Sequence, residues 1–296
     1  MSKIIVIVGP TAVGKTKLSI ALAKKFDAQI INADAAAIYK NANIGTAKIT
    51  EEEREGIKHY MIDVASLSEN YTVRDFQYDG RKILNSLIEE KKNIIIVGGS
   101  GLYTKALLYD YKFTDEEETK DYSNLTNEQL KQKVDEIYSD NNIHMNNRKR
   151  LERFLSHYEV TGEIIKNNEG KDKPLYNFTL IGLTADKEEL YKQINKRVDK
   201  MFEEGLLKEV NELKNYPKTK TLIGYKETID YLDGKISFEE AKEEIKRNTR
   251  KFAKRQYTWY KHQFENINWF KTDYFEFDKT INNVIQFLLG DGNDEK

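Results

Sequence analysis

The sequence of 296 residues contains no cysteine and only three prolines. The absence of cysteine excludes disulfide bonds, thiolate metal sites and redox chemistry at a thiol, and it fits a reducing cytoplasm. Neither sign of charge is in excess, because 48 Lys and Arg residues balance 49 Asp and Glu residues. The net charge of -1 provides no global field that would attract nucleic acid or a membrane, so any affinity for nucleic acid must come from local patches.

Long hydrophobic runs are also missing. The apolar runs, such as Ile4–Val8 and Ile94–Val97, have the length of strands, and no signal-peptide pattern precedes the first of them. We therefore expect a cytoplasmic protein that does not associate with membranes. A chain of 296 residues can bury one sizeable core and carry a smaller appended domain.

The apolar runs that are present predict a parallel sheet. Ile4–Val8 is a continuous β-branched run that suits a strand buried on both faces, and a glycine-rich loop follows it at once. Apolar residues then recur at helical spacing over Lys15–Phe26, and further buried strands are expected at Ala28–Ile31, Asn93–Val97 and Phe178–Leu183. The pattern predicts an α/β fold, a P-loop NTPase-like doubly wound parallel sheet with a helical insertion domain and a helical C-terminal part.

Changes of composition along the chain predict its domain organisation. Residues 1–106 form the first part of the P-loop α/β core, and residues 107–177 form a polar helical insertion. Residues 178–290 continue the core with basic C-terminal helices, and residues 291–296 are expected to be a disordered tail.

The segment after the first strand has the pattern Gly-x-x-x-x-Gly-Lys-Thr. Its glycines let the backbone curl so that the amides point inward, and the following helix adds its positive N-terminal dipole. Lys15 supplies an ammonium group for the outer phosphate oxygens, and the Thr16 hydroxyl is the expected Mg²⁺ ligand. The motif lies between a predicted strand and a predicted helix, and this position favours phosphate binding over a structural glycine loop. The predicted phosphate-binding residues are Gly9, Pro10, Thr11, Ala12, Val13, Gly14, Lys15 and Thr16. The loop recognises charge and spacing alone, so it does not distinguish a nucleoside triphosphate from another pyrophosphate.

Two further polar residues follow strands that end at the same edge of the predicted sheet, where ligands of open α/β folds bind. Asp34 could accept a proton from a nucleophile or hold a metal-bound water, and the alternative is an N-cap or turn aspartate. Ser100 lies in the turn Gly98–Tyr103, which offers close backbone approach and a hydroxyl group. A glycine-rich turn with no functional role is the alternative there.

Motifs along nearly the whole chain follow one another in the order of a known family. After the phosphate loop they are Asn32-Ala33-Asp34, Ile38-Tyr39-Lys40, Ile44-Gly45-Thr46-Ala47-Lys48, His59-Tyr60-Met61-Ile62-Asp63, Gly98–Tyr103, Asn195–Met201, Ile223-Gly224-Tyr225-Lys226 and Ala253-Lys254-Arg255-Gln256. In this order they resemble the tRNA dimethylallyltransferase family, also called tRNA isopentenylpyrophosphate transferases. The resemblance implies transfer of a dimethylallyl group from dimethylallyl diphosphate to N6 of the adenine just 3′ of the anticodon, with Mg²⁺ as cofactor.

The resemblance also implies roles for individual residues. Lys15, Arg197 and Mg²⁺ held by Thr16 would bear the charge of the leaving diphosphate, although Arg197 could equally be a surface charge on a helix. Asp34 would orient or deprotonate the exocyclic amine. The hydroxyl of Ser100 would hydrogen-bond the adenine at a position where the family usually has threonine.

Binding of a tRNA anticodon stem-loop, the implied partner, requires local basic surface. Residues 245–264 contain many Lys and Arg residues with aromatics between them and no acidic residue, and a second basic cluster lies at 148–153. A solvated basic face over packed aromatics is the alternative for the first. For a protein expected to be monomeric, the predicted tRNA contacts are Asp34, Ala35, Ala36, Ala37, Ser100, Lys149, Arg150, Leu151, Glu152, Arg153, Thr221, Leu222, Ile223, Gly224, Tyr225, Lys226, Lys254, Arg255 and Gln256.

The run Ala35-Ala36-Ala37 stands where the family usually has Ser-Met-Gln or a similar trio, so polar contacts to tRNA are lost there. We infer that the diphosphate chemistry is intact and that tRNA affinity or specificity is weakened. Three alternative functions remain open. They are an isopentenyltransferase acting on a free adenine nucleotide, a tRNA-binding module without catalysis, and a P-loop kinase of small metabolites.

Overall fold

A computed structural model of the chain describes residues 2–113, 120–164 and 171–290, and the predicted tail at 291–296 lies outside them. The chain divides into two compact units. One consists of Met1–Tyr109 together with Pro174–Lys296, and the other is Asp110–Lys173. Among the described residues, no helix has both the length and the apolar character needed to cross a membrane.

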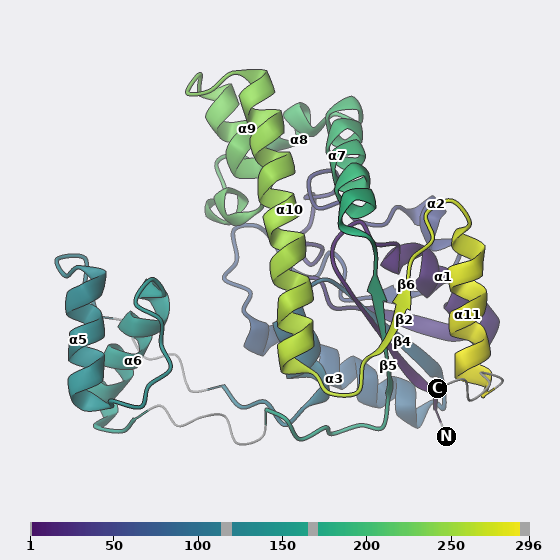
Figure 1. The fold of residues 1–296 in the computed structure, drawn as a ribbon, viewed down its shortest axis with the longest axis horizontal. Helices are drawn as coiled ribbons and strands as arrows, with labels where there is room; N and C mark the ends of the chain where they lie inside the picture. The colour runs from purple at the N-terminus through teal and green to yellow at the C-terminus, as the bar shows by residue number, and fades with distance from the viewer. Residues whose placement is uncertain (1, 114–119, 165–170, 291–296) are drawn as a thin grey trace. The chain divides into compact units, whose positions relative to one another are not determined.

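The first unit is built on a six-stranded sheet in the order β3-β2-β4-β1-β5-β6 (Figure 1). Every pair of neighbouring strands is parallel, and Ile5 of the central strand β1 pairs with Ile95 on one side and Thr179 on the other. The strands are β1 Ile4–Val8, β2 Ala28–Asn32, β3 His59–Tyr60, β4 Asn93–Val97, β5 Thr179–Thr184 and β6 Asn268–Lys271. The predicted α/β fold with a parallel sheet is confirmed.

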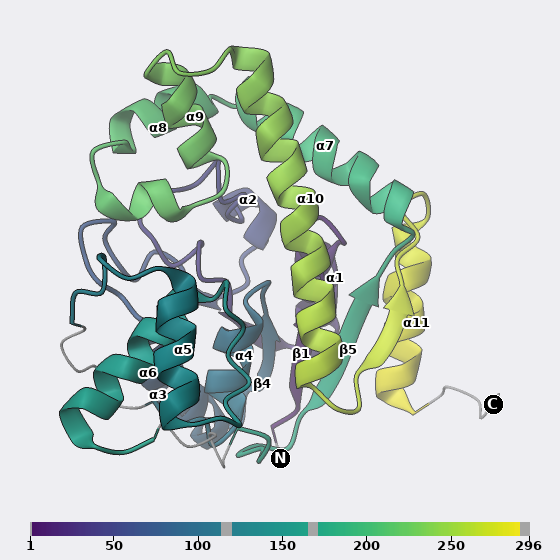
Figure 2. The ribbon, with the colours of Figure 1, turned by 60° about the vertical axis from the view of Figure 1, so that its left-hand side comes forward.

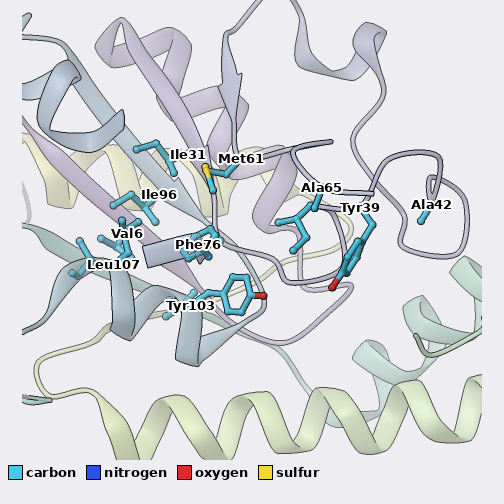
Figure 3. Close-up of a cluster of buried hydrophobic side chains, with 14 of the residues drawn as sticks. Val6, Ile31, Tyr39, Ala42, Met61, Ala65, Phe76, Ile96, Tyr103 and Leu107 are labelled. Atoms are coloured by element: carbon cyan, nitrogen blue, oxygen red, sulfur yellow. The ribbon is translucent and has the colours of Figure 1, made fainter. Parts of the chain in front are cut away.

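The central strands are buried on both faces, as their unbroken β-branched runs predict. Val6, Ile31 and Ile96 from three neighbouring strands lie on one face, where the rings of Phe76 and Tyr103 pack with their centroids 4.4 Å apart (Figure 3). Alternate residues of the strands form the core on the other face, among them Ile5, Ile7, Ile30, Ile95 and Ile181.

Helices cover both faces of this sheet. α3 (Val73–Glu89) and α4 (Gly101–Leu108) contribute to the first core, and α1 (Lys15–Phe26) and α11 (Phe277–Leu289) contribute to the second. Beyond the ends of the strands lie α8 (Leu206–Leu213), α9 (Tyr225–Leu232) and the first half of the long helix α10 (Phe238–Gln263) (Figures 1 and 2). The remaining elements of this unit are α2 Glu51–Arg54, α7 Lys187–Glu203 and the 3₁₀ helix Pro217–Thr221.

Two edge strands, β3 and β6, were not predicted from the sequence, and β6 lies within a C-terminal part that is otherwise mostly helical, as expected. β3 has two residues and β6 has four, and both are only partly buried. Segments of two and four residues are too short to show the alternating pattern of a strand. β6 is held by its parallel pairing with β5, in which Gly182 lies opposite Trp269.

The second unit, Asp110–Lys173, contains α5 (Asn127–Ile137) and α6 (Arg148–Thr161). The guanidinium of Arg148 donates hydrogen bonds to the carbonyls of Leu125 (2.8 Å) and Tyr122 (2.6 Å), which ties the start of α6 to the segment before α5. The helices enclose a small core formed by Tyr122, Leu130, Val134, Leu151, Phe154 and Leu155.

A buried carboxylate in the first unit holds the loop that follows β2. Glu209 on α8 accepts hydrogen bonds from the amides of Asn43 (2.9 Å), Ile44 (2.8 Å) and Gly45 (3.0 Å). It also accepts one from the hydroxyl of Tyr225 on α9 (2.5 Å). A Cβ atom at Gly45 would lie 2.3 Å from the ring of Tyr225, so the loop can approach α9 only with glycine there. The carboxylate therefore joins the loop to two helices.

We expect the substitution Glu209→Ala to lower the free energy of unfolding by about 3 kcal/mol, because it leaves buried amides and a hydroxyl without their acceptor. Urea unfolding followed by circular dichroism measures this change. Glu212→Ala, at an exposed position of the same helix, is the control and should change stability by less than about 0.5 kcal/mol. An equally small effect of both substitutions would contradict the role given to Glu209.

Candidate active site

The phosphate loop lies between β1 and α1, as the sequence predicts. Two side chains from the segment after β6 donate hydrogen bonds to carbonyl groups of this loop. The hydroxyl of Thr272 donates to the carbonyl of Val13 (2.9 Å), and the hydroxyl of Tyr274 donates to the carbonyl of Ala12 (3.2 Å). In a trans peptide the N–H points opposite to the C=O, so the amides of Val13 and Gly14 point away from these hydroxyls. They are turned toward the side on which a phosphate would bind.

Gly14 is required at the end of this loop for two reasons. Its φ angle of 100° lies in the left-handed region, and a Cβ atom would lie 2.3 Å from the ring of Phe277 on α11. The hydroxyl-bearing residue Thr16 is exposed in the first turn of α1. The first amides of a helix have no acceptor within the helix, so this turn also offers N–H groups to an anion.

The side chain of Lys15 folds back along the loop. Its ammonium group donates to the carbonyls of Gly9 (2.9 Å) and Pro10 (2.7 Å). The pKa of Lys15 is lowered to about 8, mainly by burial; the carboxylate of Asp34 opposes this shift and the positive charge of Arg197 contributes to it. Lys15 therefore interacts electrostatically with Asp34 and Arg197, the other two charged residues that the sequence predicts for the site.

Asp34 follows β2 at the carboxyl edge of the sheet. One of its carboxylate oxygens, Oδ1, accepts the amide of Ala36 (2.9 Å), so the turn role considered as an alternative is present. The second oxygen, Oδ2, lies 3.1 Å from the position that a Cβ atom would take at Gly99. This oxygen therefore faces the glycine turn after β4.

The turn after β4 approaches the end of β2 closely. The hydroxyl oxygen of Ser100 accepts the amide of Ala35 (2.8 Å), and the amide of Ser100 donates to the carbonyl of Ala33 (3.2 Å). A hydroxyl that accepts one hydrogen bond still has a proton to donate. Burial raises the pKa of the nearby Tyr103 hydroxyl, with smaller contributions from Tyr39 and Asp34, so this hydroxyl stays protonated.

Arg197 lies on α7 and reaches the same edge of the sheet from a third direction. It donates a hydrogen bond to the carbonyl of Ala47 at 3.5 Å. Ala47 lies in the same loop as Ile44 and Gly45, whose amides are bound by Glu209. Burial lowers the pKa of Arg197, and the charge of Asp34 opposes this shift. Lys15, Asp34 and Arg197 are thus close enough to interact electrostatically, although they come from the start of α1, the end of β2 and α7.

The predicted RNA contacts at 221–226, around the start of α9, and those on α10 differ in exposure. Thr221, Lys226, Lys254 and Arg255 are exposed, whereas Leu222 and Ile223 are partly buried, and Gly224, Tyr225 and Gln256 are buried. The hydroxyl of Tyr225 is bound to Glu209, and the side chain of Gln256 is hydrogen-bonded on both its oxygen and its nitrogen. RNA contact at these positions stays a prediction.

Within the second unit, three of the predicted RNA contacts are exposed on α6, namely Lys149, Arg150 and Arg153. Their spacing of three and four residues places them on one face of the helix. Leu151 is fully buried in the unit's own core, and Glu152 forms an ion pair with Arg148 at 2.7 Å. The basic face of α6 therefore consists of three residues, with Leu151 and Glu152 stabilising the helix beneath them.

Comparisons with known proteins match this arrangement to a family. Residues 37–263 match the family described as IPP transferase. The tRNA dimethylallyltransferase of Anoxybacillus flavithermus is 41% identical, and the match covers 97% of this chain and 96% of that protein. The tRNA dimethylallyltransferase of Enterococcus faecalis is 44% identical, and the match covers 89% of this chain and 90% of that protein.

The chain belongs to the IPP transferase family.

Solved structures of IPP transferases have the same fold. The tRNA isopentenylpyrophosphate transferase of Bacillus halodurans matches with a TM-score of 0.75 and 37% identity, over 98% of this chain and 96% of that one. A eukaryotic dimethylallyltransferase acting on tRNA matches with a TM-score of 0.78 and 27% identity, over the whole of this chain and 81% of that one. The family resemblance inferred from the sequence motifs is confirmed.

Glu209 was not predicted from the sequence, although it fixes the loop that contains Ala47, the hydrogen-bond acceptor of Arg197. A signal for it is present in the sequence of this IPP transferase. Leu206, Val210 and Leu213 form the apolar stripe of α8, and Glu209 lies on that stripe. An acidic residue at a core-facing position indicates a specific partner, because a buried carboxylate must be hydrogen-bonded.

We expect binding of inorganic pyrophosphate to take up a proton above about pH 8. The ammonium of Lys15 is charged below its pKa of about 8, whereas at higher pH the free protein holds a neutral amine that bound pyrophosphate would recharge. Affinity should therefore fall as the pH rises past 8. Titration calorimetry in two buffers with different ionisation enthalpies measures the proton uptake.

The control for this experiment is Lys15→Arg, because an arginine side chain keeps its charge throughout this pH range. The titration of pyrophosphate itself is common to both proteins, so the difference between their pH profiles isolates Lys15. Identical profiles for the two proteins would contradict the assignment.

Proposed function

We propose that this protein transfers a dimethylallyl group from dimethylallyl diphosphate to N6 of the adenine just 3′ of the anticodon in tRNA, and releases diphosphate. The observation that carries the proposal is the position of Asp34 next to both a phosphate loop and the hydroxyl-bearing turn at Ser100. An anion site and a proton acceptor at one edge of the sheet suit a reaction in which an anionic group leaves and an amine attacks. The printed names of the relatives support the same activity.

The phosphate loop would hold the diphosphate leaving group. As the bond between the allylic carbon and the diphosphate oxygen breaks, negative charge grows on that oxygen, and the side chains of Lys15 and Arg197 would stabilise it. Lys15 would exchange the carbonyls of Gly9 and Pro10 for phosphate oxygens, because charge-assisted hydrogen bonds are the stronger ones. The developing allylic cation is stabilised by its own delocalisation.

The exposed hydroxyl of Thr16 fits a role as a Mg²⁺ ligand. The described residues contain no group of three or more carboxylate, imidazole or thiol side chains that could hold a metal ion, so the other ligands would be diphosphate oxygens and water. When bound, Mg²⁺ would neutralise part of the charge on the leaving group.

The other half of the site would hold the adenine. The amine nitrogen N6 forms a bond to the allylic carbon while the carbon–oxygen bond to diphosphate breaks, and the amine then loses one proton. Oδ2 of Asp34 is placed to accept this proton, since Oδ1 is hydrogen-bonded to Ala36. The hydroxyl proton of Ser100 would be donated to a ring nitrogen of the base and orient it.

The adenine must leave the anticodon stack to reach this site, which costs a few kcal/mol that contacts to the rest of the RNA must offset. The exposed basic residues of α6 and α10 would supply these contacts to the anticodon stem-loop. We infer that the helical insertion is a tRNA-contacting domain, and that the enzyme acts as a monomer in the cytoplasm, where its tRNA substrate is found.

We expect Asp34→Asn to slow transfer by about 10²- to 10⁴-fold, because the amide cannot accept the amine proton. The assay follows label from dimethylallyl diphosphate into an unmodified anticodon stem-loop RNA. The matched control is Asp27→Asn, at an exposed helix end where the left-handed backbone suits asparagine, and it should transfer at the parent rate.

A folded Asp34→Asn variant that transfers at the parent rate would contradict the role of Asp34. A parent protein that transfers no label to RNA would contradict the proposed function itself. Offering adenosine monophosphate or ATP in place of the RNA tests the alternatives, since label on the free nucleotide, or phosphate transferred from ATP, would indicate a different substrate class.

We expect the triple substitution of Lys149, Arg150 and Arg153 by alanine to weaken stem-loop binding and to reduce its salt dependence. Each lost phosphate contact should lower the slope of log K against log salt by about 0.7. Fluorescence anisotropy at several salt concentrations measures the slope. Lys133→Ala, at an exposed position on α5, is the control and should leave the slope unchanged. An unchanged slope in the triple variant would exclude this face of α6 from RNA binding.

A further inference from the structure

One buried amide side chain bridges the two halves of the candidate active site. Gln256 lies on α10 and is 6% exposed. Its Oε1 accepts the amide of Thr11 in the phosphate loop (2.8 Å), and its Nε2 donates to the carbonyl of Gly99 in the turn after β4 (2.8 Å). Thr11 belongs to the diphosphate half of the site, and Gly99 adjoins Asp34 and Ser100 in the adenine half.

The chemistry of this bridge requires an amide. The group on the phosphate loop is a donor and the group on the glycine turn is an acceptor, so the bridging side chain must accept on one atom and donate from another. A carboxylate could serve Thr11 but would face the carbonyl of Gly99 without a proton to offer. The approach is also close, since a Cβ atom at Gly99 would lie 2.5 Å from Nε2 of Gln256.

Two neighbouring residues of α10 bind the same turn. Trp259 and Tyr260 follow Gln256 by three and four residues, so the three side chains share one face of the helix. The hydroxyl of Tyr260 donates to the carbonyl of Gly98 (3.3 Å). A Cβ atom at Gly101 would lie 2.1 Å from the ring of Trp259. The turn is therefore held against α10 along its length, and Gln256 extends this contact to the phosphate loop.

We propose that Gln256 is a positioning residue, which sets the distance between the leaving diphosphate and the attacking adenine by fixing Thr11 relative to Gly99. This inference rests on the proposed function. Its side chain is buried and hydrogen-bonded at both ends, so this role requires no contact between the side chain and RNA. Transfer between two bound groups depends steeply on their separation, and a displacement of 1 Å can cost about 100-fold in rate.

The test compares Gln256→Met with the parent protein. Methionine keeps the length and burial of the side chain but removes both hydrogen bonds, so we expect kcat for transfer to the stem-loop RNA to fall about 10- to 100-fold. The Kd values for pyrophosphate alone and for the stem-loop alone should stay within about threefold of the parent. Such a split between kcat and binding is not expected of a residue that only stabilises the fold.

Gln256→Glu and Gln256→Asn keep the proposal testable if the methionine variant does not fold. The glutamate retains the acceptor but loses the donor, and the asparagine retains both groups on a shorter chain, so both should also lower kcat. Gln263→Met is the matched control, because Gln263 lies at the exposed end of the same helix, and it should transfer at the parent rate.

Three results would overturn the inference. Folded Gln256 variants with kcat within twofold of the parent would exclude a positioning role, and a loss of pyrophosphate or RNA affinity as large as the loss of kcat would indicate a binding role instead. Both results leave the proposed function standing. A parent protein that transfers nothing under the same conditions would refute the proposed function, and the inference about Gln256 would fall with it.

Discussion

The backbone segments that form the site meet at distances that leave no room for a Cβ atom. One at Gly98 would lie 2.2 Å from the carbonyl of Ala33, and one at Gly9 would lie 2.6 Å from the carbonyl oxygen of Leu183. These approaches bring the ends of β1, β2, β4 and β5 together at one edge of the sheet. The phosphate loop and Asp34 are neighbours because of them, so every chemical role proposed for the site depends on these positions remaining glycine.

The charges at this edge favour an anionic ligand. Lys15 and Arg197 both interact with the carboxylate of Asp34, Arg197 also interacts with that of Glu53, and burial lowers the pKa of both cations. Burial makes repulsion between the cations costly, and these carboxylates offset part of that cost. A diphosphate would supply the remaining negative charge. The same electrostatic arrangement that makes the free site costly would therefore stabilise negative charge as it develops on a leaving group.

The sequence predicts those parts of the site whose signals are local. The phosphate loop is recognisable because strand, glycines, lysine and helix follow one another directly, and a continuous apolar run is typical of each central strand. The bridging role of Gln256 has no local signal, since its partners Thr11 and Gly99 lie 245 and 157 residues away. β6 was missed for the same reason, because its strand conformation depends on pairing with β5. The sequence identified Gln256 as part of a family motif without revealing what it contacts.

The alanine run after Asp34 illustrates the same distinction between main chain and side chain. The amide of Ala35 donates to Ser100, and the amide of Ala36 donates to Asp34, so these residues orient both polar groups of the adenine half through their backbone. Backbone hydrogen bonds do not depend on the identity of the side chain. Substitution of larger polar residues by alanine would thus change what this segment presents to RNA while leaving the proton acceptor and the hydroxyl in place. This separation supports intact transfer chemistry combined with altered tRNA recognition, because the two properties depend on different atoms of the same three residues.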